Sequence, residues 1–231
     1  VALADRDEMA RTVAPLTGPP RVAMNKATQQ ARSRLETWRR NLTAPQLRHR
    51  MAEEGLALLD RVYRPSTPPP KETVPETARE PNPQDSHPNP ETWPQGRPRP
   101  NDNEVAWLGI LLTSLRIRDE AWIRIDHDDP SEDIAFWRDF VRRVDPQHAD
   151  APACLLAYAA YIAGNGGLAN MALERASPTY SMGALIKEII DAGIPPSEVR
   201  IRMTAKELAN VYADRDEDEE DPTEEIPPLA S

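Results

Sequence analysis

Apolar residues recur every three or four positions along most of this chain, and this period predicts amphipathic α-helices. The most regular pattern lies at 151–202, where it predicts helices at 152–164, 168–176 and 177–193 joined by short turns. The alternation of small and large apolar residues there resembles a tetratricopeptide-type helix hairpin. An ordinary helical core without a repeat explains the same pattern.

Each of these helices has a predicted apolar face, which on the first is formed by Cys154, Leu155, Tyr158, Tyr161 and Ile162. Leu173 is expected on the inner face of 168–176, and a stripe of four residues on that of 177–193. The four residues are Leu185, Ile186, Ile189 and Ile190. We therefore expect Leu173 and these four side chains to be buried.

The first 64 residues predict three helices, at 5–14, 20–42 and 44–64. Thr43 and Gln46 have the spacing of a capping box, in which each side chain bonds the other residue's backbone N–H. Because the loop at Thr43 is short, the two longer helices are expected to form an antiparallel hairpin. Their apolar stripes are Val22, Ala23, Ala27, Leu35, Trp38 and Leu42 on the first, and Leu47, Met51, Leu58, Leu59, Val62 and Tyr63 on the second.

After residue 100 the same period predicts further helices, the first beginning at Asn101 and the last at Thr204. Asn101 with Glu104, and Thr204 with Glu207, again have capping-box spacing. The predicted fold class is therefore all-α. It consists of an N-terminal helical hairpin, a Pro-rich linker and a C-terminal multi-helix bundle that contains the tetratricopeptide-like helix hairpin.

Two segments lack the apolar pattern. Residues 65–100 contain twelve prolines and almost no aliphatic side chain, so burial cannot offset the entropy cost of ordering them. Residues 214–231 contain nine acidic residues and one arginine, which predicts self-repulsion. We therefore divide the chain into a basic helical hairpin (1–64), a Pro-rich disordered linker (65–100), a C-terminal helical domain (101–213) and an acidic disordered tail (214–231).

Charge is distributed unevenly along the chain. The formal net charge is −10, yet residues 21–64 carry ten Lys or Arg against four acidic residues. Clustered arginines beside an aromatic ring can hold phosphate or stack on a base. On that interpretation, the candidate contacts to an anion or nucleic acid are Arg32, Arg39, Arg40, Arg48 and Trp38, and the acidic tail competes for them. A solvated helix face whose arginine stems cover apolar surface and pair with acids elsewhere explains the same pattern.

The sequence predicts no catalytic residue, no cofactor and no metal site. Cys154 lies on an apolar helix face, where a small buried side chain is expected rather than a nucleophile. Residues 126–129 (Asp-His-Asp-Asp) are adjacent in sequence, so we interpret them as a loop and helix cap rather than as metal ligands. Residues 164–167 (Gly-Asn-Gly-Gly) lie between helices without a following Lys, which favours a turn over a nucleotide-binding loop.

Three motifs resemble a known family of proteins. They are LLAYAAYIAGNGGLANMALERA at 155–176, PTYSM at 178–182 and AGIPPS at 192–197. They are similar to the actinobacterial domain-of-unknown-function family numbered four-one-nine-two. Members of that family usually carry an α/β region ahead of these helices, so the resemblance implies that this chain is the C-terminal helical part and lacks that region. Because the family has no established activity, the resemblance supplies no catalytic residues.

These patterns favour a non-enzymatic helical protein-interaction module with an unidentified protein partner. A cytoplasmic location is expected, because no apolar run approaches the roughly 20 residues that span a bilayer and no signal peptide is visible. Two alternatives stay open. One is a nucleic-acid-associated protein that uses the basic hairpin. The other is part of an enzyme whose catalytic region lies in a missing N-terminal portion, since the chain begins at Val1 rather than Met.

Overall fold

The computed structural model describes residues 2–63, 93 and 99–218, and within them every regular element is a helix. The predicted all-α fold class is therefore confirmed. The helices are α1 (Ala2–Val13), α2 (Pro19–Asn41), α3 (Ala44–Val62), α4 (Asp102–Leu111), α5 (Leu115–Ile123), α6 (Ser131–Arg143), the 3-10 helix η1 (Pro146–His148), α7 (Asp150–Ile162), α8 (Gly166–Leu173), α9 (Ser181–Asp191) and α10 (Ala205–Asp218). None of the helices in these ranges is both long and apolar enough to cross a membrane.

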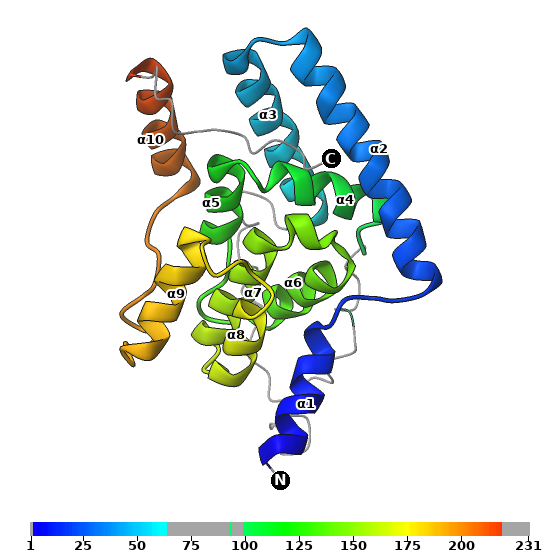
Figure 1. Cartoon of the computed structure of the whole chain (residues 1–231). Coiled ribbons are helices and arrows are strands. Elements are labelled where there is room, and N and C mark those ends of the chain that lie inside the picture. The colour runs from blue at the N-terminus through cyan, green and yellow to red at the C-terminus, as the bar shows by residue number, and fades with distance from the viewer. Residues whose placement is uncertain (1, 64–92, 94–98, 219–231) are drawn as a thin grey trace, which may run out of the picture.

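The centre of the molecule is α7, which is buried along nearly its whole length (Figure 1). It is apolar on all sides, as expected of a helix that other helices surround. Helices α6, α8 and α9 pack against it. The large side chains of α6 fill the core beside it, since Phe136, Trp137 and Phe140 are each at most 1 % exposed. The rings of Phe136 and Trp137 also meet that of Tyr63 at the end of α3, with centroids 4.7 and 4.9 Å apart.

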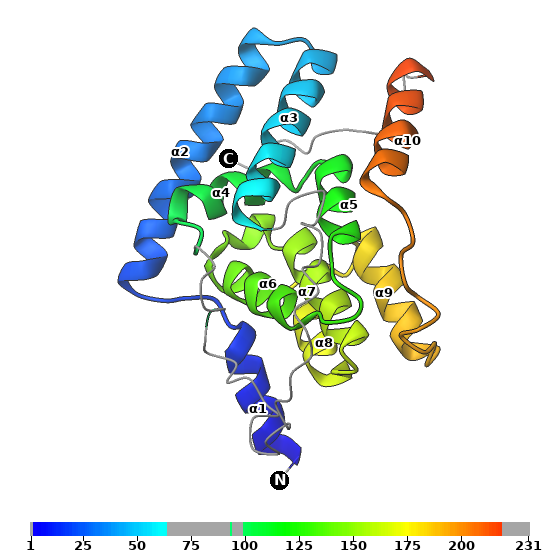
Figure 2. The ribbon, with the colours of Figure 1, turned by 180° about the vertical axis from the view of Figure 1, so that it is seen from behind.

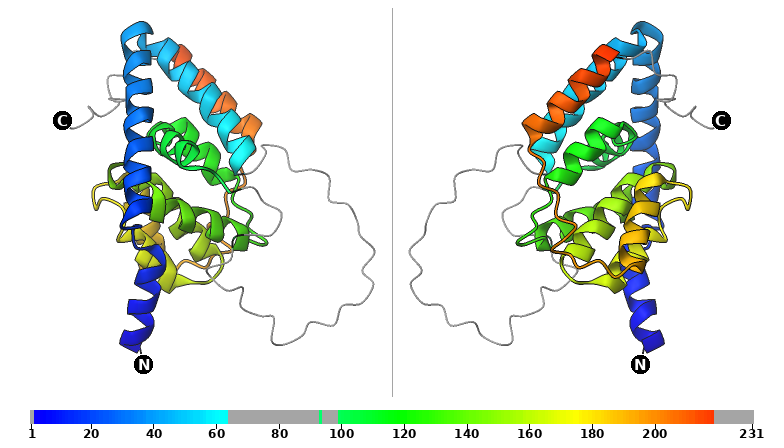
Figure 3. Two further views of the ribbon diagram at one scale, coloured as in Figure 1. Left: turned by 90° about the vertical axis from the view of Figure 1, so that its right-hand side faces the viewer. Right: turned by 90° about the vertical axis from the view of Figure 1, so that its left-hand side faces the viewer.

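Helices α2 and α3 meet near the turn at Leu42 and Thr43 and then diverge (Figure 3). Helix α4 lies in the angle between them and packs on both, while α3 also packs on α5; Figure 2 shows this arrangement from behind. The buried core therefore continues from α2 and α3 through α4 and α6 to α7. The helices on either side of the Pro-rich segment pack directly on each other.

Local signals in the sequence place several helix ends correctly. Helix α7 is followed by Gly164 with a φ of 74°, and α9 by Gly193 with a φ of 64°, a backbone conformation that glycine adopts at little cost. The expected capping boxes are also present, formed by Thr43 with Gln46, Asn101 with Glu104, and Thr204 with Glu207. In each case the residues that mark the helix end lie within one helical turn of that end.

Helix α9 begins at Ser181, later than the predicted start at 177, and its N-cap is Tyr180 rather than Ser177. The backbone N–H of Ser177 donates to a carboxylate oxygen of Asp150 at 2.7 Å. Its hydroxyl lies 2.9 Å from that of Thr179. Ser177 therefore closes a turn against the start of α7, and the chain enters the helix only after this turn.

The predicted apolar stripe of α9 is only partly right. Ile186 is fully buried, whereas Leu185 is 46 % exposed. Ile189, Ile190 and Leu173 are half-buried rather than buried. The reason is that α9 packs through a narrow face, where a Cβ on Gly183 would lie 3.4 Å from the sulfur of Cys154. Side chains turned away from that face point toward solvent.

The stripe of α2 also differs from the prediction at its start. Val22 is 68 % exposed and Ala23 is exposed, while Met24 and Thr28 face the core. Arg21 explains this rotation, because its guanidinium donates to the backbone carbonyls of residues 142–144 at 3.0–3.2 Å. These carbonyls end α6, where a cation is favourable. With Arg21 turned toward α6, its neighbour Val22 points away from the core.

The described residues include only parts of the two segments predicted to be disordered. Most of 65–100 lies outside the described residues, but Trp93 packs on the core with its ring 6.0 Å from that of Phe136. The prediction of a disordered tail from residue 214 is wrong for its first part, because α10 continues to Asp218. A helix already started by its capping box extends readily, since each added residue gains a backbone hydrogen bond. Residues 219–231 lie outside the described residues.

Candidate functional site

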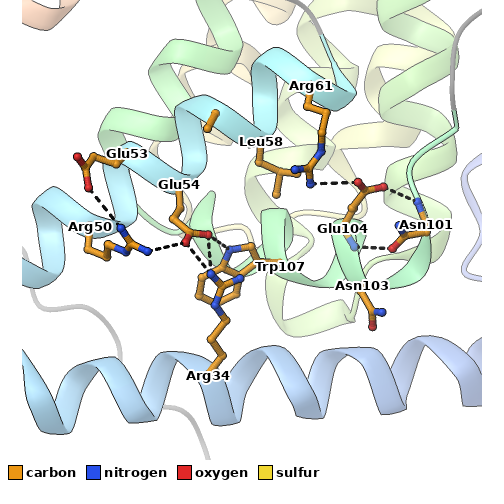
Figure 4. Close-up of a pocket in the computed structure, with 11 residues that line it drawn as sticks. Arg34, Arg50, Glu53, Glu54, Leu58, Arg61, Asn101, Asn103, Glu104 and Trp107 are labelled. Atoms are coloured by element: carbon orange, nitrogen blue, oxygen red, sulfur yellow. Dashed lines mark hydrogen bonds and ion pairs between the residues drawn. The ribbon is translucent and has the colours of Figure 1, made fainter.

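A groove of about 760 Å³ lies between α2, α3 and α4 (Figure 4). It exists because α2 and α3 diverge, so that side chains of all three helices face one another across the gap. Its lining residues are Arg34 from α2; Arg50, Glu53, Glu54, Ala57, Leu58 and Arg61 from α3; and Asn101, Asn103, Glu104 and Trp107 from α4 and its N-cap. The groove is thus lined by arginines, glutamates, amides and a small apolar surface.

One end of the groove holds a stack of aromatic and arginine side chains. The rings of Trp38 and Trp107 meet edge to face, with centroids 5.1 Å apart. The Arg34 guanidinium lies 4.3 Å from the Trp107 ring and 5.0 Å from the Trp38 ring, and that of Arg50 lies 5.4 Å from Trp38. These are favourable cation–π distances. Two sequence-distant tryptophans are therefore held in one place by two arginines.

Glu54 connects this stack to all three helices. Its carboxylate accepts hydrogen bonds from Arg34 at 2.6 and 2.7 Å, from Arg50 at 3.1 Å, and from the Trp107 indole N–H at 3.2 Å (Figure 4). The donors come from α2, α3 and α4 respectively. Charge-assisted bonds of this kind are shorter and stronger than neutral ones. Glu54 therefore orients the Arg34, Arg50 and Trp107 side chains.

The other end of the groove repeats the pairing of arginine with glutamate. Arg61 of α3 lies 3.1 Å from Glu104, which also accepts from the backbone N–H of Asn101 at 2.8 Å. The Asn103 side chain is exposed at this end and forms no hydrogen bond with any described residue. The apolar side chains of Ala57 and Leu58 lie between the two ends. The groove has a small apolar centre flanked by two polar clusters.

The charges in the groove balance. Three arginines and three glutamates line it, and each arginine forms an ion pair with a glutamate. Paired charges of this kind orient a ligand more than they attract one sign of charge from a distance. The arrangement suits a ligand that offers both hydrogen-bond donors and acceptors and one apolar group.

The five predicted contact residues do not converge. Arg32 points toward η1, where it bonds Gln147 and lies 3.5 Å from Asp145. The Arg40 side chain is exposed and hydrogen-bonds only Thr37 among the described residues, and Arg39 is half-buried nearby. Arg48 lines a separate small hollow between α3, α5 and α10. Of the five, only Trp38 contributes to the stack beside the groove.

The sequence interpretation missed Arg34, Arg50, Glu54 and Trp107. Part of the signal was present, because Arg34 with Trp38 and Arg50 with Glu54 are four residues apart and so share a helix face. The convergence of these two pairs on Trp107 depends on how α4 packs between α2 and α3. The spacing of residues within a single helix therefore cannot predict that these side chains come together at Trp107.

Most of the basic residues at 21–64 have partners within the protein. Arg21 donates to backbone carbonyls, and Arg32 pairs with Asp145. Arg34 and Arg50 pair with Glu54, and Arg61 with Glu104. Four of these five arginines, Arg32, Arg34, Arg50 and Arg61, pair with acidic residues, and Arg21 bonds backbone carbonyls instead. The local excess of positive charge is therefore smaller in the folded protein than along the sequence.

The other candidate groups form structural contacts. Cys154 is buried, and burial raises the pKa of its thiol to about 12, so the thiolate is not populated at neutral pH. Asp126 accepts from the N–H groups of Asp128 and Asp129, and Asp129 accepts from that of Ser131 ahead of α6. The loop predicted at 126–129 is therefore present, but the predicted cap is not, because the N-cap of α6 is Pro130, which makes no side-chain cap hydrogen bond. Within the ranges that the structure describes, no group of three His, Cys, Asp or Glu side chains is arranged to hold a metal ion.

A protein-family model described as a domain of unknown function, DUF4192, matches residues 1–197. The chain belongs to the DUF4192 family. The DUF4192 match includes α1 to α9 and therefore the whole groove, whereas α10 lies beyond it. No curated protein and no solved structure matches the chain.

Proposed function

We propose that this DUF4192 chain is a helical protein-interaction module whose groove between α2, α3 and α4 binds a short segment of a partner protein. The observation that carries the proposal is the stack of Trp38 and Trp107 with Arg34 and Arg50 at one end of the groove. Arginine is among the residue types that most often dominate the binding energy of protein interfaces, and the Arg34 and Arg50 side chains are 44 % and 50 % exposed. Glu54 already orients this stack, which reduces the entropy lost on binding.

The dimensions and polarity of the groove indicate what such a segment contains. A volume of about 760 Å³ holds a few side chains rather than a folded domain. Ala57 and Leu58 offer a surface for one apolar side chain, and the exposed amide of Asn103 offers a donor and an acceptor to a peptide backbone. The proposed ligand is a peptide with an apolar anchor and flanking charged residues of both signs.

The paired arginines favour a protein over nucleic acid as the partner. Affinity for a nucleic acid depends mainly on positive charges that replace the counterions of its phosphates. Arg34, Arg50 and Arg61 are each paired with a glutamate. Lys26, Arg39 and Arg40 form no ion pair with the described residues and remain as candidate contacts for phosphate. Three such residues support only weak, salt-sensitive binding.

Selection of peptides from a random phage-displayed library on the full chain tests the proposal. Selected peptides are expected to bind the wild-type chain and to lose at least about tenfold in affinity on Ala57→Trp, because the added indole fills the centre of the groove. Gln29→Trp, an exposed position of α2 outside the groove, is the matched control and should leave affinity unchanged. Both variants are first compared with wild type by thermal unfolding.

Two results contradict the proposal. One is a selection that enriches no peptide, and the other is equal affinity of the selected peptides for wild type and Ala57→Trp. Titration with single-stranded and duplex DNA at low and moderate salt tests the nucleic-acid alternative. Tight binding that weakens steeply with salt and is lost on replacing Arg39 and Arg40 would favour that alternative.

A further inference from the structure

Helix α10 is attached to the molecule by few contacts. It packs on α5, and its buried side chains in the described part are Leu208 and Tyr212, which are 5 % and 8 % exposed, whereas Val211 is 40 % exposed. The Tyr212 hydroxyl donates to Asp119 of α5 at 2.6 Å, and the Arg116 guanidinium lies 5.7 Å from the Tyr212 ring. Docking therefore depends on two anchors one helical turn apart.

The surface beneath α10 is larger than the contact that α10 makes. A hollow of about 140 Å³ remains between α3, α5 and α10. Its lining includes Tyr212 of α10, with Arg48 and His49 of α3 and Arg116 near the start of α5. The sequence of α10 carries five acidic residues against Lys206 and Arg215, so its net charge is opposite in sign to that of Arg48 and Arg116. Glu53 of α3 also lines the hollow.

The connection to α10 is held independently of α10 itself. Residues 192–204 contain no regular helix, but the Tyr158 hydroxyl donates to the carbonyl of Val199 at 2.7 Å, and Arg200 lies 3.0 Å from Asp128. The chain is therefore fixed to the body before α10 begins. Release of α10 leaves those contacts intact, and α10 lies beyond the DUF4192 match.

We infer that the face formed by α3 and α5 is a helix-binding surface, which α10 occupies within its own chain. The surface accepts from a partner an acidic amphipathic helix that carries Leu and Tyr four residues apart, as Leu208 and Tyr212 are in α10. Such a helix lays its apolar anchors on a complementary face, a common mode of protein recognition. Because the partner helix and α10 use the same anchors, α10 competes with it.

Binding of a fluorescent peptide with the sequence of 203–218 to the full chain tests this inference. In wild type, α10 is tethered at an effective concentration on the order of millimolar, so the free peptide competes poorly. In the double variant Leu208→Ala with Tyr212→Ala the surface is vacated, and the peptide is expected to bind at least about tenfold more tightly than to wild type. Val211→Ala, on the exposed side of α10, is the matched control and should behave as wild type.

A peptide that itself carries Tyr212→Ala should lose its affinity for the double variant. The inference is overturned if the peptide binds wild type and double variant equally, or binds neither, while circular dichroism shows both chains folded. Hydrogen exchange on wild type gives a second test that needs no substitution. Amides of α10 should exchange much faster than those of α7, and equal protection of the two helices would show that α10 is part of the core rather than a displaceable occupant.

Discussion

Replacement of Glu54 by alanine tests how the groove is held together. The change removes ion pairs to Arg34 and Arg50, whose side chains are 44 % and 50 % exposed, and each such pair contributes up to about 1 kcal/mol. It also leaves the indole N–H of Trp107, a residue only 6 % exposed, without its acceptor, which costs about 1–3 kcal/mol. The expected loss in the free energy of unfolding is therefore about 1–5 kcal/mol.

Urea unfolding followed by tryptophan fluorescence measures this loss. Glu53→Ala is the matched control, because Glu53 is 55 % exposed and lies 3.7 Å from Arg50, so its replacement should cost less than about 1 kcal/mol. The indole contribution is isolated with Trp107→Phe, which removes the N–H. In that background Glu54→Ala should cost about 1–3 kcal/mol less than in wild type.

Salt separates the ion-pair contribution to the stability loss from that of the indole N–H. High salt screens exposed ion pairs, so the part of the loss due to Arg34 and Arg50 should shrink in 1 M NaCl, while the part due to the indole N–H persists. If Glu54→Ala and Glu53→Ala cost the same, within the error of the measurement, the structural role assigned to Glu54 is wrong. The same conclusion follows if Trp107→Phe leaves the cost of Glu54→Ala unchanged.

Three further outcomes are expected. Burial and the nearby Arg32 lower the pKa of His148, so its imidazole is neutral in the folded protein. The contribution of His148 to stability is therefore full above the unfolded pKa of about 6.5 and is lost as the pH falls below it. His148→Gln should accordingly flatten the dependence of the thermal midpoint on pH between about 7.5 and 5. Ile186→Ala should cost about 2–4 kcal/mol in urea unfolding and Leu185→Ala less than about 1 kcal/mol, because only Ile186 is buried; equal costs would contradict the orientation of α9. Cys154 should react with a thiol reagent only in denaturant, and fast reaction of the native chain would refute its burial.

Features set within one helical turn were predictable from the sequence. Thr43 with Gln46, and Asn101 with Glu104, form the capping boxes that their spacing indicates, and Gly164 and Gly193 follow the ends of their helices. The interactions that decide these features join residues at most a few positions apart, so their geometry is carried by the sequence itself.

The rotation of each helix about its axis depends on its neighbours. Val22 and Leu185 fit an apolar period yet lie in solvent, because Arg21 and Gly183 set which face of each helix approaches the core. Asp133 shows the opposite case. A carboxylate expected at the surface is fully buried, since it accepts from the Tyr63 hydroxyl at 2.6 Å and from the N–H of Asp126 at 2.9 Å.

The groove itself was decided by tertiary structure alone. Its polar contacts join Glu54 to Trp107, and Arg61 to Glu104, across the Pro-rich segment, and they form only once α4 packs between α2 and α3. The sequence determined that this chain folds as amphipathic helices and where most of those helices begin and end, because local hydrogen bonds and apolar period are encoded residue by residue. Which arginine meets which carboxylate was settled by packing, because two side chains more than forty positions apart become neighbours only through the arrangement of the helices that carry them.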